Sequence, residues 1–407
     1  MFNAGRTREQ IEALELTGIY PDYQPLMATL PAQVNGRQVS VSFDAELPPR
    51  VSYWRPGLGC STLPIGAAPP AEGSAPAPPH GAEPRPWPMG DAGIRPKPSS
   101  ALTAHVSAAF SGSYGDKART VGVVIVHDGR VVAERYAEGF GPFTSNRTWS
   151  VAKSITGTLA GIAVHKDLLR ADALAPIPEW RTPGDPRAAI TLDQLLRMAS
   201  GLHSDTAGNR TDALYTGATT VTQEATHWPL EAAPGSRFRY ANNDTLLAVR
   251  AIRATLNDDQ AYLSFPRAAL FEKIGMRHTV AETDWQNNFI LSSQVWSTAR
   301  DLARLGLLWL NDGVWAGKRL LAEGWVKYMA TPSGPQPAQG EGYGATLWLF
   351  GPKQGLPEGS YGAQGNRGQY IMVVPSKRLV IVRRGEDPAG GGFDIEKFSA
   401  DVLKAIE

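Results

Sequence analysis

The stretch from Ser150 to about His165 constrains the fold more than any other part of the chain. It contains few helix-breaking residues, and its apolar residues recur at helical spacing. These apolar residues are Val151, Ile155, Leu159, Ile162 and Ala163. We therefore expect a helix whose first turn places Ser150 and Lys153 three residues apart, on one face and within mutual reach.

The Ser150–Lys153 spacing has a chemical meaning, because a serine hydroxyl is a poor nucleophile until a neighbouring base removes its proton. A lysine buried at a helix N-terminus can be that base, since desolvation and the positive end of the helix both disfavour its charged form. The same terminus offers free backbone N–H groups, including that of Ser150, to a developing oxyanion. Ser-x-x-Lys also recurs by chance, and its ordinary interpretation is an N-capping serine followed by a solvated lysine.

Strand patterns occur on both sides of this helix along the sequence. A helix-like segment from Leu102 leads into Thr120–His127, and the hairpin signal Asp128-Gly129 joins that strand to Arg130–Tyr136. Three later strands are expected at Ala345–Phe350, Gly368–Val374 and Arg378–Arg384, before a closing helix from Phe393 to about Ile406. The sequence therefore predicts an antiparallel sheet built from both ends of the chain.

Between these strands, from Ile190 to about Leu310, the pattern is helical. One helix is defined by Thr191 as N-cap, Gln194 at the capping-box position and Gly201 as stop. Two more helices are expected, one from Thr245 to about Ala254 and one from Trp296 to Asn311-Asp312-Gly313. The predicted fold class is α+β, with an antiparallel sheet flanked by helices and a mostly helical domain.

Residues 1 to about 100 differ from the remainder. A short helix-like piece from Thr7 to Leu16 precedes Val39–Phe43, whose alternation indicates a strand. The tract from Pro64 to Pro98 is rich in Pro, Gly and Ala, and we interpret it as an irregular connecting wrap rather than as an independent fold or a ligand for SH3-type partners. The expected division is an N-terminal arm (1–100), an α/β domain (101–175 and 335–407) and a mostly helical domain (176–334).

Composition argues against several classes of function. The 40 basic and 39 acidic residues leave no strong field for nucleic acid or an anionic membrane. The single cysteine, Cys60, excludes an internal disulfide, and no Cys/His cluster has metal-ligand spacing, so we expect neither metal nor other cofactor. We expect no transmembrane segment and, from Met1–Arg6, no signal peptide. The compartment stays open (cytoplasmic, or periplasmic if an export leader precedes this sequence), and so does the oligomeric state, a homodimer included.

Two further motifs follow the Ser-x-x-Lys helix in order. Ser150-Val151-Ala152-Lys153 is followed by Tyr240-Ala241-Asn242 and then by Gly362-Ala363-Gln364-Gly365 on a late strand. The set resembles serine hydrolases related to class C β-lactamases and D-Ala-D-Ala carboxypeptidases, nearest to 6-aminohexanoate-dimer hydrolases and β-lactamase-like esterases and amidases. Ile190–Leu202 and Trp296–Trp325 are similar to other characteristic stretches of that group. The resemblance implies a β-lactamase/transpeptidase-like fold and a small-molecule amide or ester substrate.

The resemblance also implies a role for each motif residue. Ser150 is the expected nucleophile and Lys153 its general base, with Tyr240 across the pocket as a phenol or phenolate that relays a proton to the leaving group. Tyrosine is too weakly acidic for that role at neutral pH unless a cationic neighbour lowers its pKa, and otherwise Tyr240 is a half-buried aromatic at a helix entrance. The amide of Asn242 is expected to orient Lys153 or a substrate carbonyl, to cap the following helix, or both.

The late motif departs from the β-lactamase pattern, which has Lys-Thr-Gly where this chain has Ala363-Gln364-Gly365. The lysine helps to hold an antibiotic's carboxylate and alanine cannot, so efficient β-lactam hydrolysis is not expected. Gly365 permits a close backbone approach, and in this register the N–H of Asn366 joins that of Ser150 as an oxyanion hole. Gln364 and Arg367 are candidates for substrate contact, with an ordinary turn role as the alternative for Arg367.

Other residues near the motifs are interpreted as structural. His203 and Asp205 are assigned to a loop rather than to the pocket rim, and Trp149, Trp228 and Trp348 to the core rather than to pocket walls. The sequence thus predicts a serine acyl hydrolase that forms a covalent acyl-enzyme on Ser150. The alternatives are a cell-wall D-amino-acid peptidase or weak β-lactamase, and a non-catalytic scaffold on the same fold.

Overall fold

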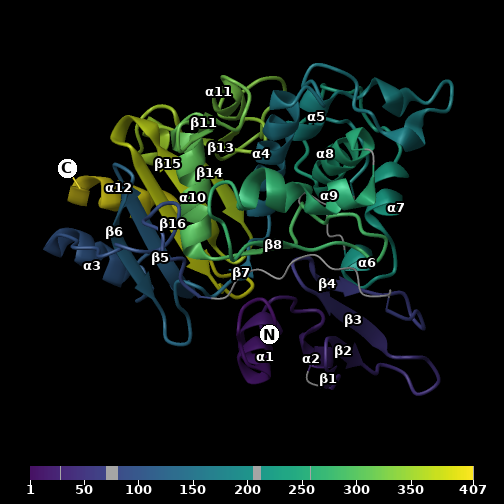
Figure 1. Cartoon of the computed structure of the whole chain (residues 1–407), viewed down its shortest axis with the longest axis horizontal. Coiled ribbons are helices and arrows are strands. Elements are labelled where there is room, and N and C mark those ends of the chain that lie inside the picture. Colours follow the sequence, from purple (N-terminus) through teal and green to yellow (C-terminus); the bar gives the residue numbers. More distant parts are fainter. Residues whose placement is uncertain (28, 70–80, 205–211, 257, 407) are drawn as a thin grey trace.

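The computed structural model describes residues 1–27, 29–69, 81–204, 212–256 and 258–406. Figure 1 shows a sheet with helices on both faces, a helical region beside it, and a smaller N-terminal unit below them. The helices are α1 (Arg8–Glu15), α2 (Gln24–Met27), α3 (Ser100–Ala108), α4 (Val151–His165), α5 (Leu192–Leu196), α6 (Asp212–Tyr215), α7 (Val221–Thr226), α8 (Asn242–Thr255), α9 (Asp259–Phe265), α10 (Ala299–Leu310), α11 (Trp325–Met329) and α12 (Ile395–Ile406). Among these described helices, none combines the length and the apolar character that crossing a membrane requires.

The largest sheet has seven strands in the order β12-β13-β14-β15-β16-β5-β6, each antiparallel to its neighbours. The strands of the chain are β1 (Ala32–Asn35), β2 (Gln38–Val41), β3 (Arg50–Arg55), β4 (Gly59–Thr62), β5 (Thr120–His127), β6 (Arg130–Tyr136), β7 (Asn146–Arg147), β8 (Val280–Ala281), β9 (Val295–Ser297), β10 (Val314–Trp315), β11 (Lys318–Arg319), β12 (Gly342–Tyr343), β13 (Trp348–Phe350), β14 (Ser360–Gly365), β15 (Gln369–Val374) and β16 (Leu379–Gly385). The pairing of β16 with β5 confirms the predicted sheet built from both ends of the chain.

Helices cover both faces of this sheet, because its central strands are apolar on both sides. Val124 and Val126 of β5 pack in one core cluster with α4 and α10, whereas Val123 and Ile125 pack in a second cluster with α3 and α12. Successive side chains of a strand point to opposite faces, so an unbroken apolar run satisfies both clusters. In Figure 1, α3 and α12 lie along one side of the sheet and α10 lies against the other.

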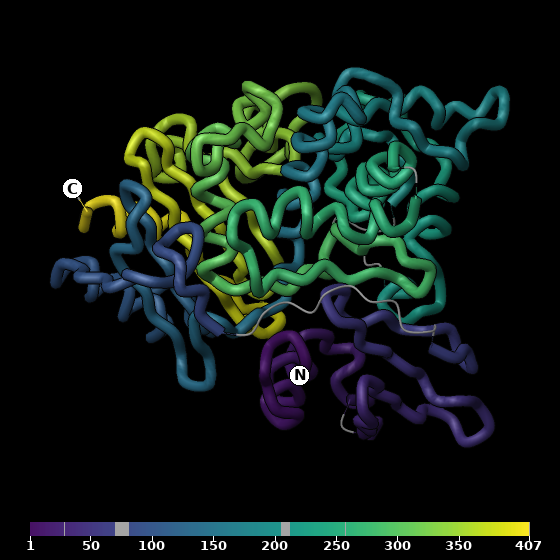
Figure 2. The backbone as a smooth tube through the Cα atoms, in the orientation of Figure 1, coloured from purple at the N-terminus to yellow at the C-terminus, as the bar shows by residue number. Residues whose placement is uncertain are grey.

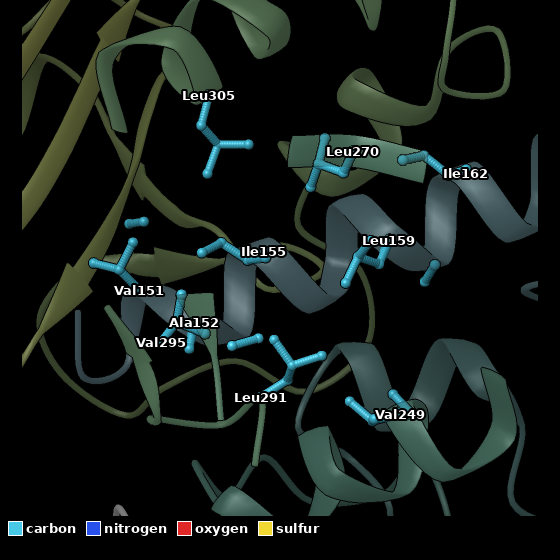
Figure 3. Close-up of a cluster of buried hydrophobic side chains, with 14 of the residues drawn as sticks. Val151, Ala152, Ile155, Leu159, Ile162, Val249, Leu270, Leu291, Val295 and Leu305 are labelled. Atoms are coloured by element: carbon cyan, nitrogen blue, oxygen red, sulfur yellow. The ribbon is translucent and has the colours of Figure 1, made fainter. Parts of the chain in front are cut away.

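Helix α4 lies between the sheet and the helical region, and every residue from Val151 to Ala163 is buried. Figure 3 shows its apolar side chains among those of the surrounding elements; the labelled residues are Val151, Ala152, Ile155, Leu159, Ile162, Val249, Leu270, Leu291, Val295 and Leu305. A Cβ on Gly161 would lie 2.3 Å from the Trp325 ring, so glycine is required for this close approach. Packing on all sides fixes the position of the N-terminus of α4.

The helical region differs from the prediction in where one helix ends. Thr191 and Gln194 form the predicted capping box of α5, but the helix ends at Leu196 and not at Gly201. Met198 adopts φ 58°, and the chain then runs beside a later segment, where the carbonyl of Gly201 accepts from the N–H of Glu231. Tertiary pairing therefore replaces the last predicted turn of the helix.

Two other helices start at different residues from those predicted. Helix α8 begins at Asn242, three residues before the expected Thr245. Helix α10 begins at Ala299 after the Thr298 cap, because Trp296 belongs to β9, which pairs with β7 and β8. The predicted ends of α10 and of the closing helix are confirmed to within two residues.

The N-terminal segment contains more regular structure than predicted. Thr7 and Gln10 form a capping box for α1, as the helix-like piece indicated, but β1–β4 form a four-stranded antiparallel meander where one strand was expected. Within residues 64–69 and 81–98 of the Pro-rich tract, the structure contains only the isolated bridge Pro86↔Ala92; residues 70–80 lie outside the described ranges. Figure 2 shows the chain around the N-terminus as a unit below the rest of the molecule.

Candidate active site

Ser150 lies where the chain turns from β7 into α4. The preceding residue, Trp149, has φ 51°, a left-handed conformation that is uncommon for a bulky side chain. Ser150 occupies the N-cap position of α4, but its side chain makes no capping hydrogen bond. The interpretation of Ser150 as a capping serine is therefore wrong, and its hydroxyl is directed to Lys153 instead.

Lys153 is buried, with 1% of its surface exposed, so the alternative of a solvated lysine is also wrong. Its Nζ lies 3.1 Å from Ser150 Oγ, 2.5 Å from Asn242 Oδ1 and 3.0 Å from the carbonyl oxygen of Ser292. We call these four residues the Lys153 network. None of the three partners is charged, and desolvation lowers the pKa of Lys153 from 10.5 to about 7.

The partners of Lys153 differ in what they can do with a neutral amine. The Asn242 amide oxygen and the Ser292 carbonyl can only accept hydrogen bonds, whereas a serine hydroxyl can also donate one. A neutral amine has two N–H bonds and one lone pair. The ammonium form of Lys153 donates to all three oxygens, including Ser150 Oγ; in the neutral form, two N–H bonds directed to Asn242 and Ser292 leave the lone pair facing Ser150 Oγ.

Asn242 is brought to this point by the first turn of α8. The N-cap of α8 is Ala241, so the capping role considered for Asn242 is wrong. Asn242 contacts Nζ, as the orienting role suggested by the sequence requires, and that role stays a prediction. Ser292 was not predicted, because its contribution is a backbone carbonyl, which leaves no trace in the side-chain pattern.

Tyr240 lies across from the Ser150–Lys153 pair, just before α8. Lys153 Nζ is 4.9 Å from the centroid of its ring, and the ring of Trp348 is 5.4 Å away on another side. Burial raises the pKa of Tyr240 to about 12, against a smaller lowering by a side-chain hydrogen bond with Ser150. The lowering expected from a cationic neighbour is not found, and the form present at neutral pH is the phenol.

Strand β14 brings its last residue, Gly365, against the segment that carries Ser150. A Cβ on Gly365 would lie 2.4 Å from the carbonyl oxygen of Thr148 and 3.2 Å from the backbone N of Ser150. Only glycine permits that approach. Gly365 pairs with Gln369 across the hairpin, so the exposed Asn366 lies in the turn beside the N-terminus of α4. The use of its N–H as an oxyanion donor stays a prediction.

The other residues of the late motif have different surroundings. Ala363 is 1% exposed and belongs to the core, and the half-buried Gln364 donates from Nε2 to Glu341 Oε1 at 3.1 Å. Arg367 is buried, with Nη2 donating to the carbonyl of Leu14 at 2.7 Å and Nη1 2.5 Å from Glu386 Oε2. For Arg367, the turn role is therefore the one observed, and the suggested substrate contact is wrong.

The residues interpreted as structural are placed only partly as predicted: Trp228 and Trp348 are half-buried rather than core residues, and the ring of Trp348 lies 5.4 Å from that of Tyr240. His203 lies on a loop, where Nδ1 contacts Glu231 and its ring packs 4.9 Å from that of Trp228. Trp149 is buried beneath the guanidinium of Arg147, which lies 3.6 Å from its ring centroid. Asp205 lies outside the described residues.

The assembled groups are those of acyl transfer: a hydroxyl, a buried amine of low pKa, a phenol and the N–H groups at a helix N-terminus. Within the described ranges, no group of three or more His, Cys, Asp or Glu is arranged to hold a metal ion. A family model described as "Beta-lactamase" matches residues 108–385, which is more than half of the 407 residues. The chain belongs to the β-lactamase family.

Relatives of this β-lactamase-family chain include a curated hydrolase. This chain is 26% identical over 299 residues to the 6-aminohexanoate-dimer hydrolase of Paenarthrobacter ureafaciens, and the aligned region covers 65% of this chain and 72% of that protein. A Bacillus anthracis structure with the provisional name of 6-aminohexanoate-dimer hydrolase superposes with a TM-score of 0.60 at 24% identity, covering 72% of this chain and 79% of the other. A class C β-lactamase in complex with cefoxitin gives 0.57 at 15% identity, covering 75% and 98%.

These comparisons confirm the predicted family and its α+β, β-lactamase/transpeptidase-like fold. The β-lactamase family to which the chain belongs consists of serine hydrolases, with amidase and esterase homologues. The match spans Ser150, Lys153, Tyr240 and the β14 motif, whereas residues 1–107 and the segment after Gly385 lie outside it.

Proposed function

We propose that this protein is a serine acyl hydrolase that cleaves an amide or ester bond through a covalent acyl-enzyme on Ser150. The proposal depends chiefly on one observation: a buried amine, held by two acceptors that cannot take a proton, lies 3.1 Å from the Ser150 hydroxyl. A base whose pKa is near the working pH transfers protons most effectively, and Lys153 has a pKa of about 7.

In the proposed first half-reaction, Ser150 Oγ bonds to the carbonyl carbon while its proton passes to Lys153 Nζ. The carbonyl oxygen becomes an oxyanion, which accepts from the N–H groups of Ser150 and Asn366. The bond to the leaving group then breaks, and the phenol of Tyr240 supplies a proton to the departing nitrogen or oxygen. The proton on Lys153 then passes to the Tyr240 phenolate, which restores the phenol and the neutral amine.

In the second half-reaction, water attacks the acyl carbon and its proton passes to Lys153 Nζ. The new oxyanion collapses, the ester bond to Ser150 Oγ breaks as Oγ takes that proton from Lys153, and the carboxylic acid leaves. Linear amides are a reasonable part of the substrate range, because the curated relative at 26% identity is a 6-aminohexanoate-dimer hydrolase. The buried Ala363, in the place of a lysine, argues against β-lactam antibiotics as substrates.

The proposal is tested with an activity-based probe and a substrate panel. A fluorophosphonate is expected to label wild-type protein at Ser150 and to leave Ser150→Ala unlabelled. Nitrophenyl esters and short linear amides are expected to be hydrolysed, with nitrocefin and D-Ala-D-Ala peptides as probes for the β-lactamase and peptidase alternatives. Undiminished ester hydrolysis by Ser150→Ala, or a wild-type protein inert toward the whole panel, would rule out the proposed mechanism.

Tyr240→Phe tests the proton relay separately. The ring and its packing against Trp348 are kept, and only the hydroxyl is lost. We expect about a hundredfold lower kcat, which is within the usual contribution of a general acid. An amide should lose more than a nitrophenyl ester, because nitrophenolate leaves without protonation. Equal losses for both substrates would contradict the relay.

A further inference from the structure

A buried carboxylate directly after β16 connects three separate parts of the chain. Glu386 is 2% exposed. Its Oε1 accepts from Asn146 Nδ2 at 2.7 Å, and its Oε2 lies 2.5 Å from Arg367 Nη1. Arg6 of the N-terminal segment lies 3.7 Å from the same carboxylate. We call Glu386, Asn146, Arg367, Arg6 and Glu15 the Glu386 cluster.

Glu15 joins the cluster from the last residue of α1. Its carboxylate contacts Arg6 at 2.6 Å and Arg367 at 3.4 Å. The guanidinium of Arg367 also donates to the carbonyls of Leu14, at 2.7 Å, and Glu386, at 3.1 Å. Figure 1 shows the consequence for the chain path: α1 lies directly below the end of the sheet where the β14–β15 turn is found.

Two arginines and two carboxylates balance each other in this cluster. Burial of an ion pair is compensated only when each charge finds partners, and truncating one member leaves an uncompensated charge. Arg367 has φ 58°, so the turn that it occupies is held in a left-handed conformation by these contacts. The cluster therefore fixes the β14–β15 turn to α1 and to the end of β16.

The segments joined by Glu386 are those that carry the two proposed oxyanion donors. Asn146 begins β7 and precedes Ser150 by four residues, and Arg367 directly follows Asn366. Between them, Gly365 lies against the backbone of Thr148 and Ser150. Arg6, Glu15 and Glu386 all lie outside residues 108–385, the range that the family model matches.

We propose that Glu386, supported by Arg6 and Glu15, is a positioning residue that sets the separation of the Ser150 and Asn366 N–H groups. This role rests on the proposed acyl hydrolase function. It also gives the N-terminal segment a part in the reaction, since Arg6 and Glu15 are two of the four charges that hold the turn. Donor position matters because an oxyanion hole works only at hydrogen-bond distance from the developing charge.

The test compares esters with thionoesters in isosteric variants. Glu386→Gln keeps the shape of the side chain and removes its charge. For a nitrophenyl ester, kcat is expected to fall about tenfold to a hundredfold with little change in KM, since small misplacements of this kind have such effects. Sulfur is a larger and weaker acceptor than oxygen, so a matched thionoester gains less from the oxyanion hole and should lose less when the hole is displaced.

Asp91→Asn is the matched control. Asp91 is also a buried carboxylate between two arginines, with Oδ1 2.9 Å from Arg304 and 3.5 Å from Arg300, and it ties another N-terminal stretch to α10. It contacts neither oxyanion segment in the contacts that the structure describes. We expect this variant to lose stability while keeping wild-type kcat for both substrates.

Glu15→Gln is the second variant, because Glu386→Gln can fail to fold. It should lower ester turnover less than Glu386→Gln, again more than thionoester turnover. If wild type is labelled at Ser150 and active, but the folded variants of Glu386 and Glu15 match Asp91→Asn with both substrates, the positioning role alone is overturned. If wild type is neither labelled nor active, the proposed function is overturned with it.

Discussion

Lys153 and Arg367 are both buried basic side chains, and their surroundings are opposite in character. Lys153 has only neutral partners, and desolvation lowers its pKa to about 7. Arg367 has two carboxylates, and a guanidinium stays charged in any protein environment. The comparison shows that burial alone does not decide the charge of a basic side chain. Neutral acceptors around it favour the uncharged form of an amine, whereas carboxylates around it favour the charged form and make a structural ion pair.

The largest effect is expected when the amine of Lys153 is removed. Lys153→Met fills a similar volume without a base, and we expect about a 10³-fold lower kcat/KM, the range of a general base. Lys166→Met, at the exposed C-cap of the same helix, serves as the control and should keep wild-type activity. Steady-state ester hydrolysis at pH 8 measures both, and an active Lys153→Met would remove the lysine from the mechanism.

Placing a carboxylate beside the amine gives Lys153 the kind of charged surroundings that Arg367 has. Asn242→Asp puts a carboxylate where the amide oxygen lies 2.5 Å from Nζ. An opposite charge at that distance raises the pKa of lysine, so the acidic limb of the kcat/KM profile should move upward by about 2 pH units. At pH 7 the rate falls about a hundredfold and recovers in alkali. Asn242→Ala, which loses the amide but adds no charge, should show a lower rate without that shift.

The contact at Gly365 tests whether the two environments are mechanically linked. In Gly365→Ala the added methyl lies 2.4 Å from the carbonyl oxygen of Thr148, so strand and nucleophile segment must separate. We expect a loss of about 1–3 kcal/mol in the free energy of unfolding, as for other overpacked sites, and about tenfold lower kcat. Gly392→Ala, where nothing lies within 4 Å, is the control. Stability is measured by chemical denaturation and turnover by ester kinetics. If Gly365→Ala lowers stability but leaves kcat unchanged, the two environments are not linked through this contact.

The smallest expected effect is a difference in the pH dependence of stability. The unfolded chain binds the lysine proton up to pH 10.5, whereas folded Lys153 releases it near pH 7. Between these values the unfolded state holds more protons, so wild-type stability rises with pH relative to Lys153→Met. From pH 7.5 to 8.5 the gain is about 1 kcal/mol. Parallel stability curves for the two proteins would mean that Lys153 is not neutral in the folded state.

The sequence predicted the Lys153 network better than the Glu386 cluster, for a physical reason. Three of the four residues in the Lys153 network, Ser150, Lys153 and Asn242, belong to sequence motifs with characteristic local spacing, and only the backbone carbonyl of Ser292 was missed. Glu386 joins residues that are hundreds of positions apart and belong to no motif, and only the folded chain brings them together.

The fold predictions likewise succeeded where the signal is local in the sequence and failed where distant segments interact. The β5–β6 hairpin and the α4 helix depend on local turn signals and periodicity, and both were predicted. The end of α5 was not, because the Gly201–Glu231 pairing that replaces its last turn is not local. The meander β1–β4 was missed because its strands have four to six residues, few of them fully buried, so alternation is weak.

The strand order of the large sheet has a consequence for how this protein is made. Val382 of β16 pairs with Val124 of β5, and α4 packs beneath strands that come some two hundred positions later in the sequence. At ordinary ribosomal speeds the nascent helix waits on the order of tens of seconds for β14–β16 to be synthesised. Throughout that interval the part of its apolar surface that later packs against β14–β16 lacks those partners, so the surroundings of Ser150 are complete only when translation is nearly finished.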